Sequence, residues 1–177
     1  MNKKIFRRGF TLIELLVVIS IIGILSSIFL NKIGDFRNRA EDARRVADLR
    51  HVQTLLELFY NQCGFYPNSQ TPSTPGTDAS GHIMCGATTA AAGEITWANL
   101  KIILSNYKLG TKATSIPSDP SGDRTYHYAS DGSGYVLRAD LKEDNTVLKD
   151  APSNTIFTLD CSKRDATNSV YNYCIEF

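Results

Sequence analysis

The chain has 177 residues, with 19 Lys and Arg against 18 Asp and Glu and a formal net charge of +1. Four of the basic residues lie within residues 1–9, so the remainder has 15 basic against 18 acidic side chains, a net charge of about −3. A mildly acidic body excludes bulk electrostatic attraction to nucleic acid. Nucleic-acid binding is therefore possible only through a local patch, and nothing in the sequence supports one.

Residues 10–30 form an almost uninterrupted apolar run with a single charge, Glu14. As a helix this run extends about 31 Å, enough to cross a bilayer core of about 30 Å. The basic residues before it predict a cytoplasmic N-terminus; they are Lys3, Lys4, Arg7 and Arg8. A carboxylate inside a membrane helix is costly, so Glu14 is expected to need a partner.

Two simpler interpretations fit this run less well. A secretory signal peptide needs a short apolar stretch followed by a small-x-small cleavage site. Here the stretch is longer, has no alanine, and offers only Ser26 and Ser27 before further bulky residues. A plain single-span anchor explains neither Glu14 nor the small Gly9 between Arg8 and Phe10.

The string RRGFTLIELLVV at residues 7–18 resembles the class III signal of type IV prepilins and type II secretion pseudopilins. In that family a prepilin peptidase cuts after the glycine and methylates the new N-terminal amine. The resemblance implies cleavage after Gly9, methylation of Phe10, a leader at residues 1–9 and a transmembrane assembly helix at residues 10–31. It also implies that Glu14 pairs with the N-terminal amine of a neighbouring subunit.

The same resemblance implies a structural pilin, the subunit of a type IV pilus that serves adhesion, motility or DNA uptake. Its expected partners are other pilin subunits, the prepilin peptidase, an inner-membrane assembly platform and a separate ATPase. The precursor is expected in the inner membrane and the filament outside the cell. The alternative is a pseudopilin of a type II secretion system. An enzyme is not expected, because no catalytic constellation or phosphate-binding loop is present.

Residues 32–62 are predicted to continue the helix as its amphipathic half, in a spine of about 53 residues and roughly 80 Å. Apolar residues mark one face: Ile33, Phe36, Ala40, Ala43, Ala47, Leu49, Val52, Leu56 and Phe59. The charged face, which includes Asp42, Arg45 and Asp48, is expected to be solvated or to guide packing between subunits. Pilins commonly have a helix-breaking proline where this chain has Asn31, and their helix often loses order near it. Without that proline, local melting is less expected here, although it stays open.

Residues 63–177 are predicted to form a globular head, so that the whole chain is an α+β protein with the type IV pilin fold: a long N-terminal helical spine, membrane-spanning in its first half, packed on a small antiparallel β-sheet. We expect a loop at 63–93, a short helix at 94–108 and an antiparallel sheet at 124–177. A hairpin is predicted from 126–128 and 134–141 around a turn at 130–133, with further strands at 155–159 and 171–177. The stretch at 116–120, followed by Tyr126 and Tyr128, also resembles a pilin loop and first strand.

Four cysteines in an exported chain indicate disulfides, with three possible pairings. We favour the local pairs Cys63–Cys85 and Cys161–Cys174, the second closing a loop near the C-terminus as in many type IV pilins. A zinc site that combines Cys63 and Cys85 with His82 is disfavoured, because the spacing lacks a paired C-x-x-C.

Other site chemistry is weakly indicated, and no metal or cofactor is expected. The histidines lie in no nucleophile motif; they are His51, His82 and His127. Oxygen ligands for calcium gather in one stretch but match no EF-hand spacing, so that surface solvation is favoured. They are Asp140, Glu143, Asp144, Asn145 and Asp150.

Overall fold

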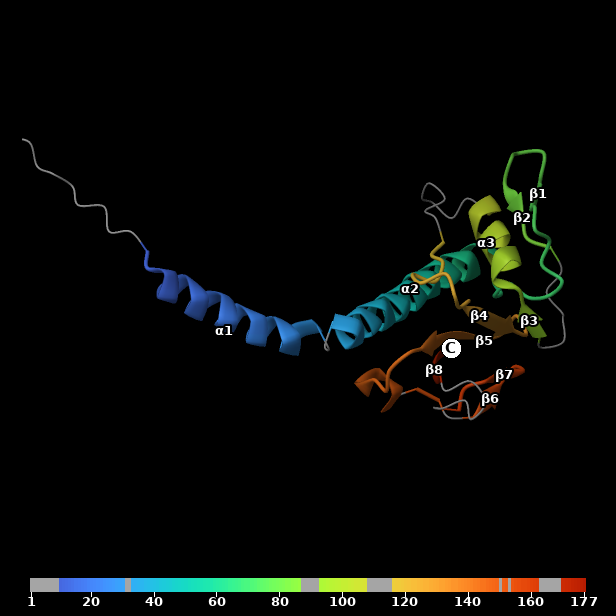
Figure 1. Ribbon diagram of the computed structural model, residues 1–177. Helices are drawn as coiled ribbons and strands as arrows, with labels where there is room; N and C mark the ends of the chain where they lie inside the picture. The colour runs from blue at the N-terminus through green and yellow to red at the C-terminus, as the bar shows by residue number, and fades with distance from the viewer. Residues whose placement is uncertain are drawn as a thin grey trace, which may run out of the picture. The chain divides into compact units, whose positions relative to one another are not determined.

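A computed structural model describes residues 10–30, 33–86, 93–107, 116–149, 151–152, 154–162 and 170–177, without the side chains of residues 28–30. The chain divides into two compact units, Met1–Arg37 and Asn38–Phe177. Figure 1 traces both units, and each is described here by itself.

The first unit is built on helix α1, Leu12–Leu30. Its described side chains are exposed, from Leu12 at 88% to Val17 at 48%. Within the described part of the chain, no helix has both the length and the apolarity that a membrane span requires. The predicted transmembrane role of residues 10–31 therefore stays a prediction.

Helix α2 spans Ile33–Cys63. Its buried residues recur at steps of mostly three and four, which places them on one face; they are Asp42, Arg45, Leu49, Val52, Leu55, Leu56 and Phe59. The helix ends where Gly64 adopts a left-handed φ of +77° and donates its N–H to the Tyr60 carbonyl at 2.7 Å. The helix thus ends one residue after the predicted bound at residue 62. Residues 31 and 32, between α1 and α2, lie outside the described residues, so the continuity of the predicted spine stays a prediction.

The centre of the second unit is a four-stranded antiparallel sheet in the order β3-β4-β5-β8. The strands span Gly93–Ile95, His127–Ser130, Tyr135–Leu141 and Tyr171–Glu176. The predicted hairpin is present as β4 and β5, around a turn in which the Asp131 carboxylate accepts backbone N–H groups from Ser133 and Gly134. Residues 93–95, predicted as the end of a loop and the start of a helix, are an edge strand instead.

Both faces of the sheet are covered. The odd-numbered residues of β5, such as Leu137 and Leu141, join the main core with α2 and with helix α3, Trp97–Asn106. On the other face, Val136 and Cys174 pack with Ile156 in a smaller cluster. Figure 1 shows α2 on one side of the sheet and the β6–β7 hairpin on the other.

The predicted strand at 155–159 is wrong. The structure has a tight hairpin of β6, Thr155–Ile156, and β7, Leu159–Asp160. The chain reverses at Phe157 and Thr158, which have φ values of 47° and 93°. Such values are uncommon for bulky or β-branched residues, and neither is a turn former, so the sequence had no signal for this reversal.

The remaining elements are short. Helix α3 begins at Trp97, three residues later than predicted. It follows Thr96, whose hydroxyl accepts the Asn99 N–H. The predicted loop at 63–93 contains a small hairpin of β1, Gly76–Thr77, and β2, Ile83–Met84. A 3₁₀ helix, η1, spans Thr146–Lys149.

Candidate assembly site

The N-terminal segment contains the residues predicted for processing. Gly9 lies outside the described residues, and Phe10 directly after it is 88% exposed. Thr11 follows, and α1 starts at Leu12. The described part of this segment therefore presents Phe10 as an accessible apolar residue two positions before the helix.

Glu14 caps the helix in which it lies. The backbone N–H and the hydroxyl of Thr11 both donate to Glu14 Oε2, at 2.9 and 3.0 Å, and the Glu14 N–H donates to Thr11 Oγ1 at 3.3 Å. This reciprocal arrangement is a capping box, which satisfies N–H groups that the first turn of a helix leaves unpaired. Our sequence analysis missed this role, although the T-x-x-E spacing before an apolar run signals it.

The capping box uses one carboxylate oxygen. In the described part of the chain, Glu14 Oε1 accepts no hydrogen bond, while Oε2 accepts two. A carboxylate can accept about four hydrogen bonds through its two oxygens. Glu14 can therefore hold its own helix start and still receive a donor from another molecule.

The apolar surface of α1 has no partner within the part of the first unit that the structure describes. Its exposed large side chains follow every face of the helix; between residues 12 and 25 they are Leu12, Ile13, Leu15, Leu16, Val17, Val18, Ile19, Ile21, Ile22, Ile24 and Leu25. Soluble monomers rarely expose a continuous apolar surface of this extent. A helix that is apolar all round indicates burial in a membrane or among other helices.

In the second unit, a buried charged cluster connects α2 to two loops. Arg45 Nη1 donates to Asp42 Oδ1 at 2.7 Å, and Arg45 Nε donates to Asp119 Oδ2 at 2.6 Å. The side chains of Arg45 and Asp42 are fully buried, and that of Asp119 is 2% exposed. The expectation of a solvated charged face is therefore wrong for these two α2 residues, because each has a buried partner of opposite charge.

Asp42 also holds the segment after β5. Its carboxylate accepts the backbone N–H groups of Lys142 and Glu143, each at 2.9 Å. Lys142 Nζ contacts Glu41 at 2.8 Å. Together with Arg45, the Asp42 carboxylate holds α2 against the end of β5.

The stretch at 116–120, which resembles a pilin loop, contributes the other carboxylate of this cluster. Burial opposes ionisation, yet hydrogen bonds from Arg45 and Ser121 hold the pKa of Asp119 at about 2. Burial also opposes the charge of Arg45, but its hydrogen bonds to Asp119 and Asp42 raise its pKa above the ordinary value. Asp119 and Arg45 are therefore both ionised throughout the physiological range.

Tyr126 and Tyr128, which follow the stretch at 116–120 and belong to the same resemblance to pilins, also make contacts across the second unit. The Tyr126 hydroxyl donates to Asp48 Oδ2 at 2.8 Å, and the Tyr128 hydroxyl donates to the Pro67 carbonyl at 2.7 Å. Burial, followed by the hydrogen bond to Asp48, raises the pKa of Tyr126. These contacts hold β4, together with Tyr126 just before it, against α2 and against the loop that follows α2.

The structure contains two disulfides, Cys63–Cys85 and Cys161–Cys174, with sequence separations of 22 and 13. These are the pairs that the sequence analysis favoured. The first fixes the loop after α2, and the second fixes the segment after β7 to β8. Because Cys63 and Cys85 are bonded to each other, their thiolates are not available for the zinc site considered above.

The other candidate residues do not meet in one site. Among the described residues, no group of three or more His, Cys, Asp or Glu side chains could hold a metal ion. Of the calcium candidates, Asp140 pairs with Arg138 at 3.2 Å and Glu143 accepts a hydrogen bond from Asn38, while Asp150 lies outside the description. The rings of His82 and His127 contact Asp78 and Glu94.

Comparison with known proteins gives the segment its family context. Residues 6–30 match the prokaryotic N-terminal methylation motif. The chain is 30% identical over 86 residues, 48% of its length, to the type IV major pilin protein PilE1 of Neisseria gonorrhoeae. It is 32% identical over 63 residues, 36% of its length, to the type II secretion system core protein G of Escherichia coli K12.

A third relative is the type II secretion system core protein G of Pectobacterium carotovorum, 30% identical over 64 residues, 36% of this chain. The chain spans 40 to 43% of the length of these three relatives. No solved structure is significantly similar to it. The chain therefore carries the prokaryotic N-terminal methylation motif and is similar, over part of its length, to type IV major pilins and type II secretion core proteins G.

Proposed function

We propose that this chain is a structural subunit of a type IV pilus and has no catalytic activity. The observation that carries the proposal is the methylation motif at residues 6–30, which coincides with a helix whose apolar side chains are exposed. Such a helix is stable only when lipid or other protein covers it. A filament made from many copies of the helix covers it completely.

Processing would prepare the helix for this use. Cleavage after Gly9 by a prepilin peptidase removes the basic leader, keeps the apolar helix, and leaves a new ammonium group on Phe10, which is then methylated. This cation is opposite in charge to Glu14. Because Glu14 Oε1 is not used by the capping box, it can accept the ammonium of a neighbouring subunit.

The proposed route starts in the inner membrane, where residues 10–31 insert with the N-terminus in the cytoplasm. An assembly platform and a separate ATPase then move the subunit into an extracellular filament for adhesion, motility or DNA uptake. On leaving the lipid, a carboxylate that has lost water gains strongly from an ammonium partner. Assembly thus replaces lipid with the helices of other subunits.

A pseudopilin of a type II secretion system is the alternative, because relatives of that class match this chain as well as the pilins do. Deletion of the gene separates the two. Loss of long surface fibres supports the pilus, whereas loss of exoprotein release without loss of fibres supports the pseudopilin.

The assembly step is tested by two variants that divide the roles of Glu14. Glu14→Gln keeps a hydrogen-bonding side chain near Thr11 but removes the charge, whereas Thr11→Ala removes the cap and keeps the carboxylate. We expect Glu14→Gln to insert in the membrane normally and to lose most fibres, and Thr11→Ala to keep them. Normal fibre yield from Glu14→Gln, measured by shearing and immunoblotting, would contradict the proposed pairing.

A further inference from the structure

Strand β8 forms an open edge of the four-stranded sheet. Phe177 and Tyr135 exchange both backbone hydrogen bonds at 3.1 Å, so by the alternation of an antiparallel ladder Ile175 and Tyr173 also face β5. The N–H and C=O groups of Cys174 and Glu176 must point away from the sheet. Within the described part of the chain, these outward groups have no hydrogen-bond partner.

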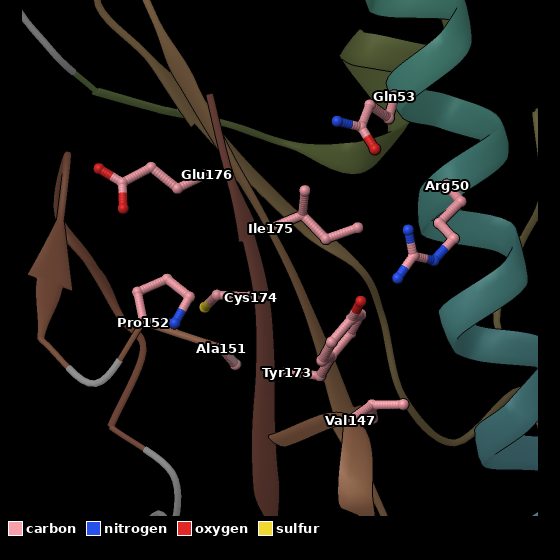
Figure 2. Close-up of a pocket in the computed structure, with 9 residues that line it drawn as sticks. All are labelled: Arg50, Gln53, Val147, Ala151, Pro152, Tyr173, Cys174, Ile175 and Glu176. Atoms are coloured by element: carbon pink, nitrogen blue, oxygen red, sulfur yellow. The ribbon is translucent and has the colours of Figure 1, made fainter. Parts of the chain in front are cut away.

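A cavity of about 530 Å³ follows this edge. Figure 2 shows its lining residues on both sides of β8. Tyr173 and Ile175 point toward α2, whereas Cys174 and Glu176 point to the other side, where Pro152 lies. The cavity is therefore a groove lined by residues from both sides of the unpaired strand edge.

The wall of the groove on the α2 side carries a positive charge without a partner. Arg50 extends from α2 toward β8 (Figure 2), and its guanidinium makes no hydrogen bond or ion pair within the residues that the structure describes. The Gln53 amide lies one turn further along the same wall. Glu176, the acidic residue of the groove, extends on the opposite side of the strand.

We propose that this groove binds an extended peptide, which adds a strand to β8 and places an acidic side chain against Arg50. An open strand edge supplies regularly alternating donors and acceptors, which an extended backbone matches and a simple anion or a sugar does not. Side chains of an added strand alternate between two faces, so one set would meet the α2 wall and the other the Pro152 wall. A guanidinium beside the edge selects a carboxylate by two parallel hydrogen bonds.

The binding test uses the full chain in detergent micelles and two fluorescent blocked peptides, Thr-Val-Glu-Val-Thr and the same peptide with Gln at its centre. Fluorescence anisotropy is expected to give roughly tenfold tighter binding of the Glu peptide, because a charge-assisted hydrogen bond outweighs a neutral one by about that factor. Arg50→Gln should remove this preference. The matched control, Arg39→Gln, neutralises another exposed arginine of α2 and should keep it.

A second variant tests the backbone contact. Glu176→Pro removes an outward N–H that takes no part in the ladder to β5, and proline is tolerated on an edge strand. This variant should bind both peptides at least several-fold more weakly with an unchanged circular-dichroism spectrum. The proposal is overturned if neither peptide binds, if both bind equally to the unmodified chain, or if Arg39→Gln acts like Arg50→Gln. Self-association that Glu176→Pro abolishes would also overturn it, by assigning the edge to a second copy of the chain.

This binding site does not depend on the proposed assembly function. The peptide affinities are measured on unassembled chains, so a failure of the Glu14 experiment leaves them unchanged. Equally, if no peptide binds, the conclusion drawn from the fibre yields of the Glu14 and Thr11 variants is unchanged.

Discussion

Helices α1 and α2 differ in the side chains that they expose and bury. The sequence of α1 is almost entirely apolar, yet its described side chains are exposed. The sequence of α2 is rich in charge, yet Asp42 and Arg45 are fully buried there. The apolar content of a helix indicates that it must be buried against lipid or protein. Which side chains are buried within the subunit depends instead on the partners that the fold provides.

The largest effect is expected from the buried charges of α2. Arg45→Leu leaves Asp42 and Asp119 without their cation in a site closed to water, so the free energy of unfolding should fall by about 3–5 kcal/mol. Urea unfolding measures this loss of stability in the second unit when it is followed by the fluorescence of Trp97, the only tryptophan of the chain. Arg44→Leu is the matched control, because the Arg44 side chain is 65% exposed and should change stability by no more than about 0.5 kcal/mol. Equal losses from both variants would contradict the role given to the cluster.

The next effect concerns the disulfides that fix two segments of the second unit. Replacing both Cys63 and Cys85 with alanine should lower the free energy of unfolding by about 3 kcal/mol, because the unfolded chain is no longer held in a closed loop and gains conformational entropy. The Cys161–Cys174 pair closes a shorter loop and should give a similar loss. The same Trp97 fluorescence assay, with and without reductant, measures both. A third variant, with all four cysteines replaced by alanine, is the control, and a reductant effect on its stability would show that the loss has another cause.

Acid should weaken the charged cluster over a defined range. The pKa of Asp119 is about 2 in the folded chain and near its ordinary value of 3.8 when unfolded. Its stabilisation is therefore complete above about pH 4 and is lost as the pH falls toward 2, with a total of about 2 kcal/mol. Unfolding measured between pH 5 and 2 should show this slope, and Asp119→Asn should flatten it. An unchanged slope in that variant would assign the acid sensitivity to other groups.

The smallest effect is expected from α1. Leu16 is 60% exposed, so Leu16→Ala should change the unfolding of the second unit by less than about 0.5 kcal/mol. Leu56 is fully buried on α2, and Leu56→Ala should cost about 2–5 kcal/mol. The two substitutions remove the same atoms from the two helices. If Leu16→Ala destabilised the second unit as much, the apolar surface of α1 would have a role inside the folded subunit.

The sequence predicted those features that follow from local pattern. The α+β class and the preferred cysteine pairs also drew on the resemblance to pilins, whereas helical spacing alone located α2 and alternation around Asp131 located the β4–β5 hairpin. Each of these features depends on residues close together in the chain, where propensity and spacing are informative.

Features that depend on distant residues were missed. Asp42 and Arg45 have the composition of a solvated helix face, and only partners far along the chain explain their burial. Arg45 donates to Asp119, 74 residues later, and Asp42 accepts the backbone N–H groups of Lys142 and Glu143. The reversal at Phe157 has no turn residue to signal it, and tertiary packing selects it instead, since the Phe157 ring packs against the smaller core. The capping role of Glu14 depends on the nearby Thr11 and could have been predicted from the T-x-x-E spacing. The prediction for Glu14 rested instead on its charge and on a partner in another subunit.

The most direct test of the central claim is mass spectrometry of the chain purified from its native cells. The account predicts a product that begins at Phe10, carries one methyl group on its amine and retains the whole apolar helix. A product with Met1 intact, or one that begins after Leu30, would contradict it.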